Sequence, residues 1–380
     1  MQTRLLKLAV TWTKVPRMSN SDGDKRSRAR KETRRRFEQW AHNPECHSNV
    51  VSAVHNIKMG AAARKENPDA PRAGQSPFAL AMGRNFEANL ISENAELLLE
   101  SLQRASVISA SSSDFADHRW RSNGGKLADL DAAVTEGKRF LTDLAAWRSF
   151  NGVVASFTVR IPKGIMLPEA NLIVDVLTVQ SHGPTPEIAV GEIKTYPDQG
   201  GHTSRANLAT ARAQMGLYVH ALEVTLEAMG LADKVKVSHT GFLVLTHAGS
   251  MRPNVRANED LKYQRERARR GFELMEESAL LLQGKYGAAD DVEDQDLLDL
   301  VLNATTSFQD SCIAFCERAP MCYAKALKEG RGVALGNDVE TFLNGVSLNR
   351  AVALLKNDRP LNSTEADLLS RMTDPLPELP

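Results

Sequence analysis

The sequence predicts an α/β fold in which a mixed central sheet is flanked by helices. Two observations support this prediction. Residues 153–161, 171–179 and 188–196 are apolar and rich in β-branched side chains, which is typical of strands. Residues 203–229 have the pattern of a helix, and a further strand is expected at 235–246. Strands followed by a helix and another strand are typical of an α/β domain with a mixed sheet.

The second and third of these strands are expected to form an antiparallel hairpin. Turn-forming residues separate them, and a hairpin centred between Gly183 and Pro184 places Asp175 directly opposite Glu192. Directly opposed residues have Cβ atoms about 4.5–5.5 Å apart. Lys194 lies two residues beyond Glu192 and therefore points to the same face. Two carboxylates that close repel unless a cation or a proton lies between them, so this face predicts a site for a hard divalent metal.

Length and charge bound the class of protein. The 380 residues are enough to bury a full core, and 47 basic against 47 acidic residues predict no polyanionic partner from net charge alone. Basic residues are concentrated in the first 40 positions, which is typical either of an arm that contacts nucleic acid or of a solvated tail. No apolar run approaches a membrane span, and the first residues lack a secretory signal. We therefore expect a cytoplasmic protein that does not enter a membrane.

Five segments are expected along the chain. They are a basic N-terminal arm (1–45), a cysteine-bearing linker (46–75), the α/β core (76–255), C-terminal helices that carry three cysteines (256–330) and a C-terminal tail (331–380).

The core is expected to begin with a helix. Ser76 is a good N-cap, and Pro77 is favoured at the first helical position. Further helices are expected at 126–147 and 258–286. Apolar residues recur at every fourth position of the first helix, at Phe78, Met82, Phe86 and Leu90.

Charged residues interrupt two apolar strands. Asp175 lies inside the apolar run 172–177 and Glu192 follows another apolar run, where an unpaired carboxylate would be costly to bury. Glu-x-Lys on a strand is more often a solvated sheet edge, and the pairing with Asp175 is what favours a functional site. On the next helix Gln214 and Tyr218 are four residues apart and share a face, which is equally typical of a core tyrosine near a surface glutamine.

This order of residues, an Asp, then Glu-x-Lys, then a helix with Gln-x-x-x-Tyr, resembles the RecB-like branch of the PD-(D/E)XK nuclease superfamily. The resemblance spans roughly residues 76–322 and implies a restriction-endonuclease-like core. It implies that Asp175 and Glu192 bind Mg²⁺ or Mn²⁺, with the Ile193 carbonyl as a further ligand. It also implies that Lys194 orients or helps to deprotonate the attacking water and steadies the charge on the phosphate.

The same resemblance implies that Gln214 and Tyr218 brace the site or contact DNA. The sequence departs from the family at two positions. Val174 stands where the motif has its proline, and the segment from Gly83 to Glu87 stands where the family often has Gly-x-x-x-His as an additional metal ligand. Glutamate is an oxygen ligand that suits Mg²⁺, so we expect Glu87 to replace the histidine. The alternative is an ordinary exposed glutamate on a helix.

The cysteines are the second signal. The chain has four, Cys46 far upstream and Cys312, Cys316 and Cys322 near the end. Clustered cysteines in a cytosolic chain suggest a metal rather than disulfides. One upstream cysteine and three downstream ones resemble the iron–sulfur staple of RecB-like nucleases of the AddB and CRISPR-associated types, although those usually have two residues rather than three within the first pair of the trio. The resemblance implies a 4Fe–4S cluster that ties the helical extensions together; structural Zn²⁺ is the alternative.

The sequence thus predicts a metal-dependent DNA nuclease that hydrolyses phosphodiester bonds at DNA ends or in single-stranded regions, in repair or in defence against phages and plasmids. The sequence has no Gly-x₄-Gly-Lys-Ser/Thr motif, so a motor would come from a separate helicase or defence-complex subunit. The alternative is a catalytically inactive iron–sulfur scaffold that binds nucleic acid.

Overall fold

The computed structural model describes most of the chain from residue 40 onward. The predicted basic arm at 1–45 lies almost wholly outside the described part, as does the predicted N-cap at Ser76. No helix within the described part is long and apolar enough to cross a membrane. The described residues are 40, 43–54, 57–70, 77–118, 127–146, 149–161, 170–181, 185–286, 294–309 and 312–373.

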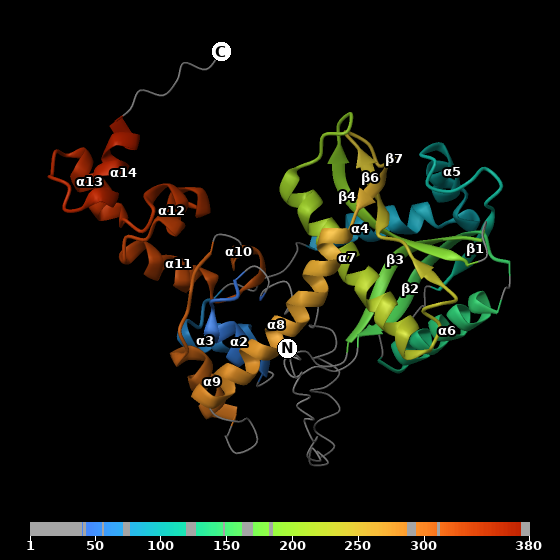
Figure 1. Ribbon diagram of the computed structural model, residues 1–380, viewed down its shortest axis with the longest axis horizontal. Helices are drawn as coiled ribbons and strands as arrows, with labels where there is room; N and C mark the ends of the chain where they lie inside the picture. The colour runs from blue at the N-terminus through green and yellow to red at the C-terminus, as the bar shows by residue number, and fades with distance from the viewer. Residues whose placement is uncertain are drawn as a thin grey trace, which may run out of the picture.

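Within these residues seven strands form one open mixed sheet flanked by helices, which confirms the predicted α/β class (Figure 1). The order across the sheet is β1-β2-β3-β4-β6-β7, and β5 pairs with β4. β1 is parallel to β2, β4 is parallel to β5 and β6, and the other neighbours are antiparallel. The strands are β1 (Asp114–Asp117), β2 (Gly152–Ile161), β3 (Ala170–Gln180), β4 (Glu187–Asp198), β5 (Lys236–Val237), β6 (Thr240–His247) and β7 (Pro253–Asp260).

The central hairpin of β3 and β4 has the register that its turn predicts. The pairing between the two strands extends as far as Val176 opposite Gly191. The next position in the same register places Asp175 opposite Glu192, as expected. This register is strongly specified, because a slip of one residue would turn every apolar side chain of the strand to the other face.

The regular alternation of β2 is interrupted beside Asp175. Ser156 on β2 occupies the ladder position that faces Asp175 on β3, and it has a positive φ of 56°. A positive φ is uncommon for a residue other than glycine and persists only where the surrounding structure holds it. As a result Val154 and Phe157, three residues apart, reach the same core cluster, whereas a regular strand needs an even spacing. The sheet is therefore distorted at the predicted site.

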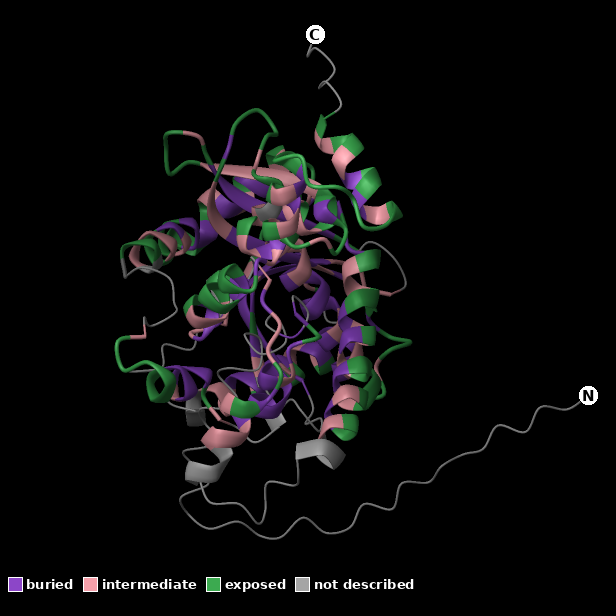
Figure 2. Ribbon diagram, turned by 90° about the vertical axis from the view of Figure 1, so that its left-hand side faces the viewer, coloured by how far each residue is buried: buried purple, intermediate pink, exposed green. Residues whose placement is uncertain are grey.

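Helices cover both faces of the sheet, and Figure 2 shows the buried strands between the more exposed helices. One face packs against α6, α7 and α8, and the opposite face packs against α4 and α5. Neighbouring residues of β6, Leu243 and Val244, belong to the two opposite clusters. The helices are α2 (His47–Val54), α3 (Met59–Glu66), α4 (Pro77–Leu90), η1 (Glu93–Ala95), α5 (Glu96–Arg104), α6 (Leu127–Ala145), α7 (Arg205–Ala228), α8 (Lys262–Tyr286), α9 (Asp294–Asn303), α10 (Cys312–Phe315), α11 (Ala319–Lys328), η3 (Gly332–Leu335), α12 (Asn337–Leu343), α13 (Leu348–Leu355) and α14 (Ser363–Thr373).

Three local predictions were wrong in their bounds. Residues 253–260 form the edge strand β7, although a helix was expected from 258 onward, because a sheet edge accepts the polar sequence of this segment. The strand expected at 235–246 is divided into β5 and β6. Residues 61–66, expected to be part of a linker, belong to α3, which packs against α9.

The first helices of the described chain meet helices from its C-terminal part beside the sheet. α2 and α3 pack against α9, and α2 also packs against α8. Figure 1 shows these blue N-terminal helices next to the orange helices α9 and α10, while α12 to α14 extend away from the sheet. Segments that are more than 200 residues apart in sequence therefore form one helical body, as the predicted N- and C-terminal extensions require.

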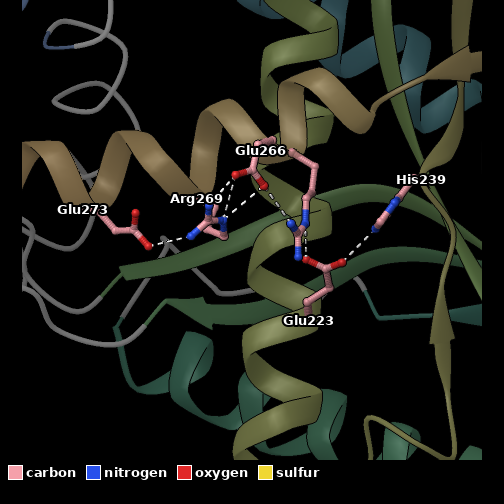
Figure 3. A network of polar contacts seen from close by, with 6 residues as sticks. Glu223, His239, Glu266, Arg269 and Glu273 are labelled. Carbon is pink, nitrogen blue, oxygen red and sulfur yellow. Dashed lines mark hydrogen bonds and ion pairs between the residues drawn. The ribbon is translucent and has the colours of Figure 1, made fainter. Parts of the chain in front are cut away.

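The long helix α8 is fixed on the sheet domain by α7. A Cβ atom at Gly216 of α7 would lie 2.5 Å from the backbone carbon of Gln264, so only glycine permits this approach. Glu223 on α7 accepts a hydrogen bond from Nε of Arg265 on α8 at 2.7 Å, and it lies 2.9 Å from Nε2 of His239 (Figure 3). Partly exposed ion pairs contribute little, so the close helix contact determines this arrangement.

Candidate active site and cysteine centre

The structure brings the two predicted carboxylates and the predicted lysine together on the β3–β4 hairpin. The backbone N–H of Ile193 donates to Oδ2 of Asp175 at 3.0 Å. Nζ of Lys194 donates to Oε1 of Glu192, which places these two side chains on the same side of β4. Asp175 and Glu192 also interact electrostatically across the two strands. The hairpin geometry argued from the sequence is therefore present, while the catalytic roles of these residues stay predictions.

The site is electrostatically unfavourable without a cation. Burial raises the pKa of Asp175 to about 8, and the Glu192 carboxylate raises it as well, while Lys194 and the Ile193 N–H oppose the shift. The Glu192 side chain is fully buried, and its Oε2 has no hydrogen-bond partner among the described residues. A buried carboxylate oxygen without a partner is costly, and one lysine does not balance two carboxylates.

These residues fit a hard divalent cation. Asp175, Glu192 and the Ile193 carbonyl are oxygen donors of the kind that Mg²⁺ and Mn²⁺ prefer, and the unpartnered Oε2 of Glu192 would be one coordination position. In the described part of the chain no three His, Cys, Asp or Glu side chains are close enough together to hold an ion as they stand. A third carboxylate would have to move toward these two carboxylates and the carbonyl to complete a donor set.

Glu87 is the third carboxylate of this region. It lies on α4, which packs against β4, and its charge raises the pKa of Asp175 further. Its side chain is half-buried rather than fully exposed. A Cβ atom at Gly83, one turn earlier, would meet no described atom within 4 Å, so the neighbouring helix surface is open to a ligand rather than covered by another backbone. The proposed metal-ligand role of Glu87 is still a prediction.

Gln214 and Tyr218 lie on α7, on the face that packs against the sheet. Gln214 is 4% exposed and Tyr218 is 1% exposed, and Tyr218 belongs to the main core cluster. Such burial suits side chains that brace a site from behind and does not suit direct contact with DNA. Of the two predicted roles, bracing the site and contacting DNA, the burial of Gln214 and Tyr218 is compatible with the first. That role stays a prediction.

Two further residues that shape the site carried no clear signal in the sequence. Ser156 faces Asp175 with its unusual backbone, and nothing in a serine inside an apolar strand predicts a positive φ. Gly191 precedes Glu192, and a Cβ there would lie 2.2 Å from the ring of Phe242 on β6. A glycine inside a predicted strand is the one available hint that another group approaches closely.

We predict that Mg²⁺ stabilises the protein more at about pH 9 than at about pH 6. In the metal-free protein the pKa of Asp175 is about 8, against an ordinary value of 3.8. The folded state therefore holds this proton more tightly, and the stability that protonation gives is lost as the pH rises through about 8. A metal ion must displace the proton, so its binding strengthens over the same range.

Thermal unfolding with and without Mg²⁺ at both pH values measures this effect. The Asp175→Asn variant should lose the dependence of the Mg²⁺ shift on pH, because it has no proton to release. An equal Mg²⁺ shift at both pH values in the unsubstituted protein would show that the ion does not bind at Asp175.

The four cysteines meet at the junction of the N- and C-terminal helices. All four are free thiols, and they line one pocket between α2, α10 and α11. Cys46 lies in the turn before α2, Cys312 begins α10, and both are buried. Cys46 and Cys312 interact electrostatically, as do Cys316 and Cys322. Residues that are far apart in the sequence are thus brought together as the cysteine pattern predicts.

The protein environment disfavours charged thiolates at this centre. Burial raises the pKa of Cys316 to about 12 and that of Cys322 to about 11; the neighbouring sulfurs act in the same direction, and Arg318 opposes both shifts. Thiolates that repel one another in a buried pocket need positive charge to form, and a metal or metal cluster would supply it. By donor type, four cysteines suit a 4Fe–4S cluster or Zn²⁺, but no three His, Cys, Asp or Glu side chains among the described residues are placed to hold an ion as they stand.

Comparison with protein-family models, with curated proteins and with solved structures gave no significant match.

Proposed function

We propose that the protein is a metal-dependent DNA nuclease of the RecB-like PD-(D/E)XK type. One observation supports this proposal above all others. The β3–β4 hairpin carries Asp175, Glu192 and Lys194 within one small region, and a buried oxygen of Glu192 has no partner among the described residues. Two carboxylates beside an ammonium group, at the end of a hairpin, are the groups that metal-assisted phosphodiester hydrolysis needs.

The order of the elements supports the same proposal. After α4 the chain forms η1, α5, β1 and α6. Three successive antiparallel strands (β2, β3 and β4), the helix α7, the short strand β5 and then β6, which is parallel to β4, follow. A core of this kind is what the resemblance to restriction-endonuclease-like nucleases implies. It sets Glu87 on α4, the carboxylates on the hairpin and Gln214 on α7.

The chemistry follows from the positions of the side chains. A bound divalent ion would screen the charge of the phosphate, lower the pKa of a coordinated water and hold the phosphodiester. Asp175 and Glu192 would supply its carboxylate ligands, with the Ile193 carbonyl beside them. Lys194, held by Glu192, would orient the attacking water, help to remove its proton and stabilise the added negative charge on the phosphate. The oxygen of the attacking water would form a new P–O bond and release its proton to solvent, while the P–O bond to the leaving oxygen breaks and that oxygen takes a proton from solvent.

The cysteine centre would be architectural. We propose that Cys46, Cys312, Cys316 and Cys322 hold a 4Fe–4S cluster, with structural Zn²⁺ as the alternative. The centre would close a loop of more than 250 residues between Cys46 and Cys312, and the entropy that the unfolded chain loses when a loop is closed grows with the length of the loop. It would hold α2 and α3 against α9 to α11, beside the proposed nuclease core.

DNA ends or single-stranded DNA are the proposed substrates, with repair or defence against phages and plasmids as the setting and a separate helicase or defence-complex subunit as motor. A second candidate is a catalytically inactive scaffold that binds nucleic acid. Two observations favour it. Glu87 stands where the family often has histidine. In addition, no three His, Cys, Asp or Glu side chains among the described residues are placed to hold a metal ion.

A cleavage assay separates the two candidates. We expect the purified protein to cleave labelled single-stranded DNA in the presence of Mn²⁺ or Mg²⁺ and to be inactive in excess chelator. The scaffold would instead retain the DNA in a mobility-shift assay and leave it intact with either ion. Double-stranded DNA and single-stranded RNA of the same sequence serve as comparison substrates.

A further inference from the structure

We propose that Asn43 is a positioning residue of the cysteine centre, and that its side-chain amide sets the reduction potential of the cluster by donating a hydrogen bond to Cys312. This inference rests on the proposed 4Fe–4S cluster. Nδ2 of Asn43 donates to Sγ of Cys312 at 3.3 Å and to the carbonyl of Ser307 at 2.6 Å. The residue is 2% exposed, so no water competes for these contacts.

The Asn43 amide contacts both the backbone and a sulfur of the C-terminal segment. Its Oδ1 is buried and has no hydrogen-bond partner among the described residues, which costs stability. Its Nδ2 contacts the Ser307 carbonyl and the Cys312 sulfur, and only the second of these contacts, to a residue 269 positions away, reaches the cysteine centre. The N–H···S contact is therefore the feature through which Asn43 would act on the cluster.

A buried cation lines the same pocket. Arg318 is 5% exposed, and it donates to Oγ of Ser48 at 2.8 Å and pairs with Glu66 at 2.9 Å. Its charge acts on Cys46 and on Cys322, its backbone hydrogen-bonds Cys316, and Asn43 contacts Cys312. Each of the four sulfurs thus has a nearby group that favours negative charge.

Such groups shift the balance between the two redox states of a cluster. A reduced cluster carries one more negative charge than the oxidised one, so hydrogen bonds to sulfur and nearby positive charge stabilise the reduced state more. Removing the Asn43 donor is therefore expected to make the cluster harder to reduce. A purely structural role of Asn43 would leave the potential unchanged.

The test uses the full-length protein with its cluster, prepared without oxygen and titrated with dithionite while the visible absorbance is followed. In Asn43→Leu the ratio of reduced to oxidised cluster at a fixed potential should fall about tenfold, the size expected for a hydrogen bond to a charged group. For a one-electron couple this corresponds to about 59 mV. Asn43→Asp keeps the shape, removes the N–H donor and should shift the potential in the same direction.

Variants at two other residues serve as controls. Ser52→Ala removes a hydrogen bond of 2.8 Å from α2 to the Ile57 carbonyl without touching a sulfur, and it should keep the wild-type potential. Arg318→Lys keeps the buried charge and should stay closer to the wild-type potential than Arg318→Gln.

Each outcome decides the inference. Both Asn43 variants with a wild-type potential would overturn it while leaving the cluster proposal intact. An equal shift of the reduction potential in Ser52→Ala would overturn it too, because a general loss of packing around the cluster would then explain the change. A colourless wild-type protein would overturn the cluster proposal and this inference together. Loss of the cluster from both Asn43 variants, with its retention in Ser52→Ala, would overturn the inference, because Asn43 would then hold the cluster in place rather than set its potential.

Discussion

Replacing Lys194 with alanine is expected to reduce DNA cleavage by about 10²- to 10⁴-fold and to leave DNA binding almost unchanged. The ammonium group donates to Oε1 of Glu192 and lowers the pKa of Asp175, so it lies where water would be oriented and charge would develop. DNA binding depends on many phosphate contacts, and the loss of one cation removes only a small part of it. Cleavage measured in Mn²⁺ and binding measured in Ca²⁺ separate these two effects.

The same substitution should also destabilise the metal-free protein. Glu192 is fully buried and forms an ion pair with Lys194, so the substitution would leave its charge without this partner unless a metal supplies one. Removing one partner of a buried ion pair typically costs about 3–5 kcal/mol. We therefore expect a lower unfolding temperature in chelator and partial recovery in Mn²⁺, because the ion supplies the missing positive charge.

Lys236 offers a matched control on a neighbouring strand. It forms an ion pair with Glu187, at the other end of β4, at 3.0 Å, and both side chains are exposed. Such surface pairs contribute about 0.2–1 kcal/mol, so Lys236→Ala should keep both stability and cleavage close to wild type. Cleavage by Lys194→Ala at the wild-type rate would refute the proposed mechanism. DNA binding without cleavage in the wild type itself would favour the scaffold.

The hairpin was predictable because its determinants are local. A short turn between two apolar strands fixes which residues face one another, and alternation then fixes the side on which each side chain lies. Asp175 opposite Glu192 follows from these two rules, and the ladder ending at Val176 and Gly191 agrees. Strands that depend on pairing with a distant part of the sheet were harder to predict. The sequence of β7 is polar, and it forms a strand because β6 offers a free edge.

The finer features of both sites depend on contacts that no local pattern records. Ser156 has its positive φ where β2 faces Asp175, and a serine within a strand sequence does not predict this conformation. Asn43 and Arg318 reach the cysteine pocket through contacts that span more than 250 residues. The cysteine spacing predicts that a metal centre exists, but the residues that tune it are recognisable only once the two ends of the chain are placed together.

Replacing Cys316 with serine is expected to remove the cluster and loosen the helical body. Cys316 is buried in the pocket, and serine has nearly the same shape but is a poor ligand for iron. The wild type should be brown, absorb near 400 nm and hold about four iron atoms per chain, and the variant should hold almost none. The lost cross-link should cost on the order of 5 kcal/mol, the scale for closing a long loop.

Iron content, visible absorbance and denaturant unfolding of oxygen-free samples measure these changes. Ile313→Ser is the control, since it makes an apolar-to-polar change on α10, just before Cys316, at a side chain that is 65% exposed. It should keep the iron and the stability of the wild type. A colourless wild type that binds zinc would retain the cross-link and refute the iron–sulfur cluster.

Cleavage by Cys316→Ser distinguishes an architectural cluster from a catalytic one. The carboxylates lie on the β3–β4 hairpin, and the cysteines lie on helices outside the sheet. An architectural role predicts that the variant loses activity only to the extent that it unfolds, so cleavage should return toward the wild-type rate at temperatures where the variant remains folded. Complete loss of cleavage in a folded variant would mean that the cysteine centre acts on DNA or on the hairpin, and the two sites could not then be treated as independent.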